Sequence, residues 1–167
     1  SADKDLTQLV GEHDRVWDFA RNQRYGVGGV VERMGVRPDQ VADFLALTGD
    51  AVDNIPGVPG VGPKTAAALL AHFGTLDAVL ARVDEVPYLR LRGAAATAAK
   101  IRTHREQALL SRQLTVIALD APVVTEPAHY GVRVPDEVIV EDLMERLRFG
   151  PMTRRRVRDH VERMRGG

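Results

Sequence analysis

The chain has 167 residues, of which 44% are hydrophobic and 28% charged, which is enough for one domain or two small lobes with a packed core. The sequence contains no cysteine, so disulfides, cysteine-ligated metal sites and thiol catalysis are excluded. No apolar run approaches the length of a membrane span and no signal peptide is visible, so we expect no membrane partner and a cytoplasmic location.

The formal net charge is zero, but the charges are unevenly distributed along the chain. Residues 1–60 carry six basic and ten acidic side chains, whereas residues 61–113 carry eight basic and four acidic ones. An acidic segment next to a basic one favours a cation site beside a site for a polyanion, although chance also produces swings of this size.

Most of the chain is expected to be helical, with one short strand at residues 16–19. Glycine or proline bounds most of the predicted helices, which cover residues 27–34, 38–49, 64–73, 76–82, 93–112, 136–147 and 153–164. The stretch 54–63 is rich in glycine and proline and predicts a tight turn between two of these helices.

Two aspartates near the N-terminus form the first candidate metal site. In an extended segment, Asp3 and Asp5 point to the same side, and two carboxylates at this spacing can bind a divalent cation such as magnesium. An isolated pair of this kind is more often a solvated turn.

A second pair of aspartates follows the helix that ends at Gly49. At the end of a helix, Asp50 and Asp53 lie on one face. Negative charge is unfavourable at a helix C-terminus, so the two carboxylates need either a compensating cation or exposure to solvent. The alternative is a solvent-facing helix end in which Asp53 caps the next turn.

The third candidate is the turn that leads into the helix at residues 64–73. Its glycines let the backbone approach a partner closely, the first amides of the helix favour an anion, and Lys64 adds a positive charge. The pattern predicts a cradle for a nucleic-acid backbone without base readout. A nucleotide P-loop is excluded because Pro63 stands where the lysine is required. A plain glycine-rich connector leaves Lys64 and the neighbouring carboxylates unexplained.

Together these three elements resemble the C-terminal half of the 5′-3′ exonuclease and flap endonuclease family, which includes the 5′-nuclease domain of bacterial DNA polymerase I. The matching segments are Asp3-Lys4-Asp5, residues 49–57 (Gly-Asp-Ala-Val-Asp-Asn-Ile-Pro-Gly) and residues 60–66 (Gly-Val-Gly-Pro-Lys-Thr-Ala). A weaker resemblance continues through residues 111–114 and 147–150.

The resemblance implies a mainly α fold that forms the C-terminal part of an α/β 5′-nuclease. Residues 1–25 would be a remnant of the α/β, PIN-like catalytic domain, and residues 26–167 the SAM-fold-like helical domain. Within the helical domain, a helix-hairpin-helix would occupy residues 48–74 approximately.

The resemblance also implies metal-dependent hydrolysis of DNA phosphodiester bonds near 5′ ends, 5′ flaps and junctions of single and double strands. It assigns two divalent ions, Mg²⁺ or Mn²⁺, to four catalytic carboxylates: Asp3, Asp5, Asp50 and Asp53. It assigns DNA contacts to Gly57, Val58, Gly60, Val61, Gly62, Lys64 and Thr65. It further implies a K⁺ ion at the backbone carbonyls of Val58 and Val61, and a DNA polymerase in the parent chain or in trans.

The family's N-terminal half, with further carboxylates, is not in this sequence, so we expect weak or no cleavage by the chain alone. The alternatives are a non-catalytic duplex-binding module and, in another class, a helical protein-interaction domain. The basic stripe Lys100, Arg102 and Arg105 is either a solvated face or a second backbone contact. Because aromatic residues make up only 5%, we expect Trp17 and Phe19 in the core rather than stacked on bases.

Overall fold

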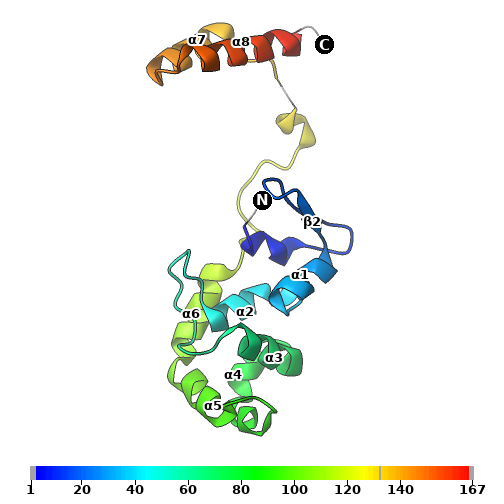
Figure 1. The fold of residues 1–167 in the computed structure, drawn as a ribbon, viewed down its shortest axis with the longest axis vertical. Helices are drawn as coiled ribbons and strands as arrows, with labels where there is room; N and C mark the ends of the chain where they lie inside the picture. Colours follow the sequence, from blue (N-terminus) through cyan, green and yellow to red (C-terminus); the bar gives the residue numbers. More distant parts are fainter. Residues whose placement is uncertain (1–2, 132, 166–167) are drawn as a thin grey trace. The chain divides into compact units, whose positions relative to one another are not determined.

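The computed structural model describes residues 3–131 and 133–165 and is mostly helical (Figure 1). The chain divides into two compact units, Ser1–Leu119 and Asp120–Gly167. The domain boundary after residue 25 concerns the parent nuclease and stays a prediction. No helix in the described parts of the chain is long and apolar enough to cross a membrane.

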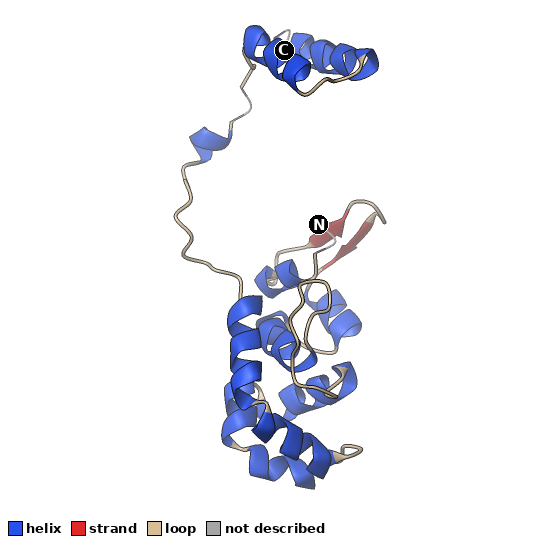
Figure 2. Ribbon diagram, turned by 90° about the vertical axis from the view of Figure 1, so that its left-hand side faces the viewer, coloured by secondary structure: helices blue, strands red, loops and turns tan. Residues whose placement is uncertain are grey.

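The first unit begins with a 3₁₀ helix, η1 (Asp5–Leu9), and a hairpin of two strands, β1 (Val16–Asp18) and β2 (Gln23–Tyr25). The strands are antiparallel, with Val16 opposite Tyr25, and are the red arrows of Figure 2. The predicted strand is confirmed for residues 16–18. The helix α1 (Val27–Met34) follows and ends at Gly35, as the sequence predicts.

The extended conformation expected around Asp3 and Asp5 is wrong. Lys4 has helical backbone angles, and η1 begins at Asp5. The reason lies in the Asp3 side chain, whose Oδ1 accepts the Asp5 amide at 3.0 Å. A carboxylate that binds the amide two residues further along stabilises a turn in competition with extended backbone.

Three helices form the centre of the first unit: α2 (Val41–Thr48), α3 (Pro63–Phe73) and α4 (Leu76–Ala81). A short 3₁₀ helix, η2 (Pro38–Gln40), leads into α2. The buried positions of α3 are Ala66, Leu69, Leu70 and Phe73, which lie three or four residues apart and so share one face. The Gln40 side chain donates to the Leu70 and Gly74 carbonyls and so ties η2 to the C-terminal end of α3.

The prediction of one long helix over residues 93–112 is wrong. It is divided at His104 into α5 (Ala94–Thr103) and α6 (Arg105–Thr115). The two parts pack on different neighbours, because α5 lies on the 3₁₀ helix η3 (Val83–Tyr88) and α6 lies along α2. A straight helix has one direction and cannot follow both surfaces. Figure 1 shows α6 beside α2 and α5 at the end of the unit.

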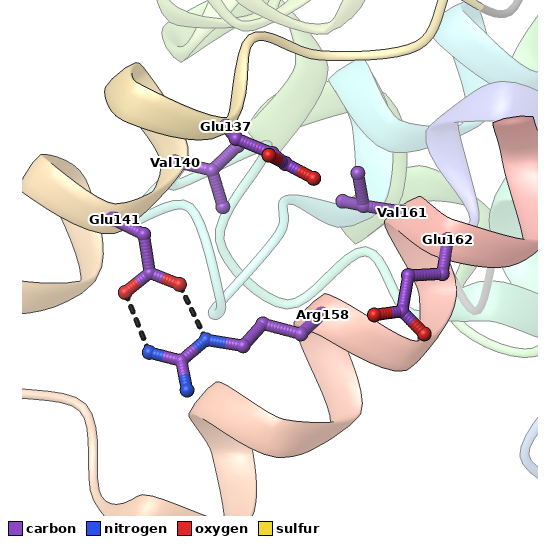
Figure 3. A pocket seen from close by; sticks show the side chains of 6 residues that line it. All are labelled: Glu137, Val140, Glu141, Arg158, Val161 and Glu162. Carbon is purple, nitrogen blue, oxygen red and sulfur yellow. Dashed lines mark hydrogen bonds and ion pairs between the residues drawn. The ribbon is translucent and has the colours of Figure 1, made fainter.

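The second unit contains a 3₁₀ helix, η4 (Pro127–Tyr130), and two helices, α7 (Glu137–Arg146) and α8 (Pro151–Arg165). Both predicted helices are confirmed, and Asp136 caps α7 by accepting the amides of Val138 and Ile139. Arg158 of α8 pairs with Glu141 of α7 beside a pocket of about 220 Å³ (Figure 3). An exposed pair of this kind contributes little stability.

Candidate metal centre and nucleic-acid interface

Asp50 lies in a tight turn, not at the end of a helix. The helix α2 ends at Thr48, Gly49 has a φ of 76°, and Asp50 and Ile55 exchange two backbone hydrogen bonds of 2.8 Å. The expectation of a helix-end geometry is therefore wrong. The turn nevertheless brings Asp50 and Asp53 together, because its ends are held by this bridge.

Three carboxylates from two distant parts of the sequence converge here. Asp5, Asp50 and Asp53 each offer an oxygen within 4.8 Å of the other two. Asp50 is buried, Asp5 is half-buried and Asp53 is exposed, so the cluster opens to solvent on one side. Asp3 is not one of the three but lies next to them, with its Oδ1 on the Asp5 amide. The sequence pattern thus identified the aspartates, while the packing of η1 on α2 brings them together.

Lys4 balances part of this negative charge, and sequence reasoning gave it no role. Its ammonium pairs with Asp50 Oδ2. Burial raises the pKa of Asp50, but the hydrogen bonds from Lys4 and the Val52 amide outweigh this, so its pKa is lowered. The pKa of Lys4 is raised, because the attraction of Asp50 outweighs the effect of burial. The position of Lys4 between Asp3 and Asp5 was the feature of the sequence that could have indicated this role.

The environment of the Asp5 carboxylate indicates whether the cluster suits a cation. Its pKa is raised, first by burial and next by the negative charge of Asp3. Its Oδ1 is buried and has no hydrogen-bond partner among the described residues. A buried carboxylate oxygen without a donor is costly, and a divalent cation relieves that cost. Together with the all-oxygen donor set, this fits a hard cation such as Mg²⁺.

Residues 57–65 comprise the end of the connection from α2 and the first turn of α3, and are here named the 57–65 turn. The Val58 amide donates to Leu47 at 2.9 Å and the Val61 amide to Val58 at 3.0 Å. The Val58 and Val61 side chains are buried, so these two residues can meet a ligand only through their backbone. Gly60, Gly62 and Lys64 are exposed, and Thr65 is half-buried in the first turn of α3. The turn therefore presents backbone groups, the N-terminus of α3 and one lysine to solvent.

Two further side chains reach this turn from α5 and α6. Gln107 Nε2 donates to the Gly57 carbonyl, and the Lys100 ammonium lies so close to Gly60 that a β-carbon there would collide with it. Lys100 belonged to the predicted basic stripe, whereas nothing in the sequence pointed to Gln107. The two arginines of the stripe bind groups within the protein. Arg102 forms an ion pair with Asp84, and Arg105 donates to the Leu80 carbonyl.

The sequence also matches known proteins. Residues 36–138 match the family model described as "5′-3′ exonuclease, C-terminal SAM fold", which is more than half of the chain. The chain belongs to this family. The mainly helical, SAM-like fold expected from the resemblance is thereby confirmed.

Its relatives include both large polymerases and shorter nucleases. DNA polymerase I of Pseudomonas aeruginosa is 48% identical over 127 residues, which cover 75% of this chain and 14% of that protein. Thermostable DNA polymerase I of Thermus aquaticus is 38% identical over 91% of this chain and 17% of its own length. A 5′-3′ exonuclease of Buchnera aphidicola subsp. Acyrthosiphon pisum is 38% identical over 74% of this chain and 43% of its own length. The chain thus spans less than half of each of these relatives.

Solved structures with the same fold come from bacteriophage T5. Its 5′-exonuclease with bound zinc is 26% identical, with a TM-score of 0.57, over 69% of this chain and 41% of that one. A flap endonuclease pseudo-enzyme–product complex with DNA and metal ions is 25% identical, with a TM-score of 0.57, over 69% and 40%.

Proposed function

We propose that this chain is the metal-carrying and DNA-binding C-terminal part of a structure-selective 5′-3′ exonuclease or flap endonuclease. Its reaction is hydrolysis of DNA phosphodiester bonds near 5′ ends and at junctions of single and double strands. The observation that carries the proposal is the short segment that joins Asp50 and Asp53 to the 57–65 turn. The two carboxylates and the proposed phosphate cradle are thereby held next to each other in one short segment.

The proposed metal ligands are Asp5, Asp50 and Asp53, with Asp3 beside them, for two ions of Mg²⁺ or Mn²⁺. A bound divalent ion lowers the pKa of a coordinated water and neutralises charge on the phosphate under attack. The protein's own part is to hold the carboxylates. Lys4 and the Val52 amide position Asp50 and keep it ionised, and the Asp50–Ile55 bridge fixes the turn that carries Asp53.

The proposed DNA contacts lie on the 57–65 turn. The α3 N-terminus, with Lys64 and Thr65 in its first turn, suits a phosphate, because the positive end of the helix dipole, an ammonium and a hydroxyl lie within three residues of one another. Gly60 and Gly62 let the DNA backbone approach, and Gly57, Val58 and Val61 contribute main-chain atoms. The carbonyls of Val58 and Val61 are the proposed K⁺ ligands. No base readout is expected.

The parent protein is proposed to hold the rest of the catalytic domain, of which residues 1–25 are a remnant, ahead of the helical domain at residues 26–167. The polymerase I relatives support a DNA polymerase as a partner, in the same chain or in trans. The alternative is a duplex-binding module without catalysis, which would need the 57–65 turn but not the carboxylate cluster.

Metal binding by this chain is tested by titration with Mn²⁺. Calorimetry and electron paramagnetic resonance measure the affinity. We expect Asp53→Asn to weaken Mn²⁺ binding at least tenfold, while Asp159→Asn, an exposed aspartate of α8, leaves it unchanged. Equal affinities for the two variants would refute the assignment of the cluster. Incubation with a 5′-flap substrate and Mg²⁺ then separates the nuclease from the module, provided that the chain is first joined to the N-terminal half of a relative, because the chain alone is expected to cleave weakly or not at all.

DNA binding is tested with a blunt duplex in EDTA at several salt concentrations. We expect Lys64→Ala to weaken binding for every sequence and to reduce the slope of log affinity against log salt by about 1. Arg163→Ala, which removes an exposed charge from α8, is the control and should leave the slope as it is. An unchanged slope for Lys64→Ala would contradict the proposed cradle.

A further inference from the structure

The β1–β2 hairpin has two different faces. Val16 and Asp18 are buried, whereas Trp17 between them points outward, opposite Arg24 of β2. Phe19, two residues further along, is 76% exposed, and Trp17 is 39% exposed. The expectation that both rings belong to the core is therefore wrong. Two three-residue strands bury only one face, and alternation puts residues 17 and 19 on the other.

The outer face is an ordered aromatic surface. The Trp17 and Phe19 rings meet edge to face with centroids 5.0 Å apart, and the Arg24 guanidinium lies 4.3 Å from the centre of the Trp17 ring. The Trp17 Nε1 donates to Asn22 Oδ1 at 3.3 Å. These contacts hold the rings in place before any ligand arrives, so little conformational entropy is lost on binding.

The other face of the hairpin carries a further basic side chain, Arg33. A pocket of about 210 Å³ is lined there by Lys4, Arg21, Arg33, Tyr25 and Asp18. Arg21 pairs with Asp18 and Lys4 with Asp50, whereas Arg33 donates to the neutral Gln23 side chain at 3.0 Å and keeps its positive charge uncompensated by any described carboxylate. Arg33 also lies over the Tyr25 ring, 4.3 Å from its centre. With Arg24 on the outer face, basic side chains flank the hairpin on both sides. Such an arrangement attracts a polyanion.

We propose that the hairpin at residues 16–25 binds single-stranded DNA, with unpaired bases stacked on Phe19 and Trp17 and Arg24 next to the sugar–phosphate backbone. Exposed aromatic faces flanked by cations suit unpaired bases, because a duplex keeps its bases stacked inside. A protein partner would require an apolar patch but not the flanking cations. The inference goes beyond the proposed function, since it needs neither the carboxylate cluster nor the 57–65 turn.

The test measures the affinity of the whole chain for a labelled twelve-residue oligo-dT by fluorescence anisotropy in EDTA. We expect Phe19→Ala and Phe19→Leu to weaken binding about fivefold or more, and Phe19→Tyr, which keeps a ring, to retain it. Tyr88→Ala, which removes an exposed aromatic from η3, is the control for a general loss of aromatic surface. Because Trp17 is the only tryptophan, its emission should also fall on binding of the unlabelled strand.

Wild-type affinity in Phe19→Ala, or a Trp17 emission that oligo-dT leaves unchanged, would overturn the proposal. Equal binding by Phe19→Leu and Phe19→Tyr would also overturn it, because an apolar docking surface for a protein needs no ring. A blunt duplex separates this site from the proposed function. Phe19→Ala should leave duplex binding intact, and Lys64→Ala should leave oligo-dT binding intact. If Phe19→Ala leaves oligo-dT binding unchanged, the hairpin assignment has failed. If Lys64→Ala leaves duplex binding unchanged, the proposed cradle has failed.

Discussion

At the scale of single residues, the contact between Gly49 and Gly57 decides the shape of the site. Both have positive φ, 76° and 60°, and a β-carbon on Gly57 would lie 2.6 Å from the Gly49 α-carbon. The two backbones approach so closely only because neither residue has a side chain. This contact places the turn of Asp50 directly against the start of the 57–65 turn.

Gly57→Ala is expected to destabilise the protein by more than about 1 kcal/mol, because alanine pays for the left-handed conformation and also meets Gly49. The free energy of unfolding from urea denaturation measures this loss. Gly28→Ala in α1 is the matched control, since its β-carbon would meet nothing within 4 Å. It should be neutral or stabilising by about 0.5–1 kcal/mol. Equal effects of the two substitutions would contradict the packing described.

Asp43 of α2 gives a pH dependence with a definite sign. Burial raises its pKa, and the Leu76 amide and Arg112 only partly oppose this. The folded state therefore binds the proton more tightly than the unfolded state, and the Asp43 contribution to stability decreases as pH rises from about 3.9 towards the raised value. Asp43→Asn removes this titration while keeping an acceptor for the Leu76 amide.

The free energy of unfolding of Asp43→Asn relative to wild type should thus increase as pH rises from 3.5 to 7. Urea denaturation at each pH measures it. Asp39→Asn is a control of opposite sign, because hydrogen bonds from Arg37 lower the pKa of Asp39. Its stability relative to wild type should decrease over the same range. Parallel curves for Asp43→Asn and wild type would show that Asp43 titrates normally.

At the scale of elements, α6 supports both the core and the 57–65 turn. Its buried residues, such as Ala108 and Ser111, face α2, and Gln107 on the same helix donates to the Gly57 carbonyl. The break at His104 permits this, since it turns α6 towards α2 while α5 stays on η3. A change in helix direction is thereby coupled to the geometry of the site.

Gln107→Ala is expected to cost about 1–3 kcal/mol of stability, because it leaves the carbonyl of the buried Gly57 without this donor. Gln107→Glu keeps the length of the side chain but not the donor at neutral pH, so it should be similarly destabilised. Gln113→Ala, at an exposed position of the same helix, should change stability by less than about 0.5 kcal/mol. Thermal and urea denaturation measure all three, and a neutral Gln107→Ala would show that the bond contributes nothing.

At the scale of the whole molecule, the two units differ in how they are stabilised. The main hydrophobic cluster lies within residues 10–108, inside the first unit. In the second unit, α7 and α8 bury only Met144 and Val161 among their described residues, and their ion pairs, such as Arg165 with Glu137, are exposed and add little. Residues 120–126, at the start of the second unit, are exposed and have no helix or strand.

Limited digestion with subtilisin should therefore cut first within residues 120–126 and leave a folded fragment close to residues 1–119. The 57–65 turn is an internal comparison. It also has little regular structure before α3, but its backbone is hydrogen-bonded to α2 and α6, so it should resist cleavage. Mass spectrometry identifies the cuts, and thermal melting of the fragment shows whether it is folded. A first cut inside α2 or α3 would contradict the division into units.

The sequence predicted local structure well where the cause is local. Gly35, Gly49 and Gly74 end helices where expected, and Thr75 caps α4 by accepting the Ala78 amide. Predictions failed where tertiary contacts decide. The helix break at His104 depends on two different packing partners, and the exposure of Phe19 depends on which face of the hairpin is covered.

The sequence alone indicated the family and the helical fold, and it predicts four aspartates as metal ligands, because short motifs of glycine, proline and charged residues need no long-range information. Only the tertiary structure decided which carboxylates meet, that Lys4 pairs with Asp50 and that Gln107 reaches the 57–65 turn. These contacts join residues that are about fifty positions apart in the chain. Their distances follow from how η1 and α6 pack on α2, and no local pattern of residues encodes that packing.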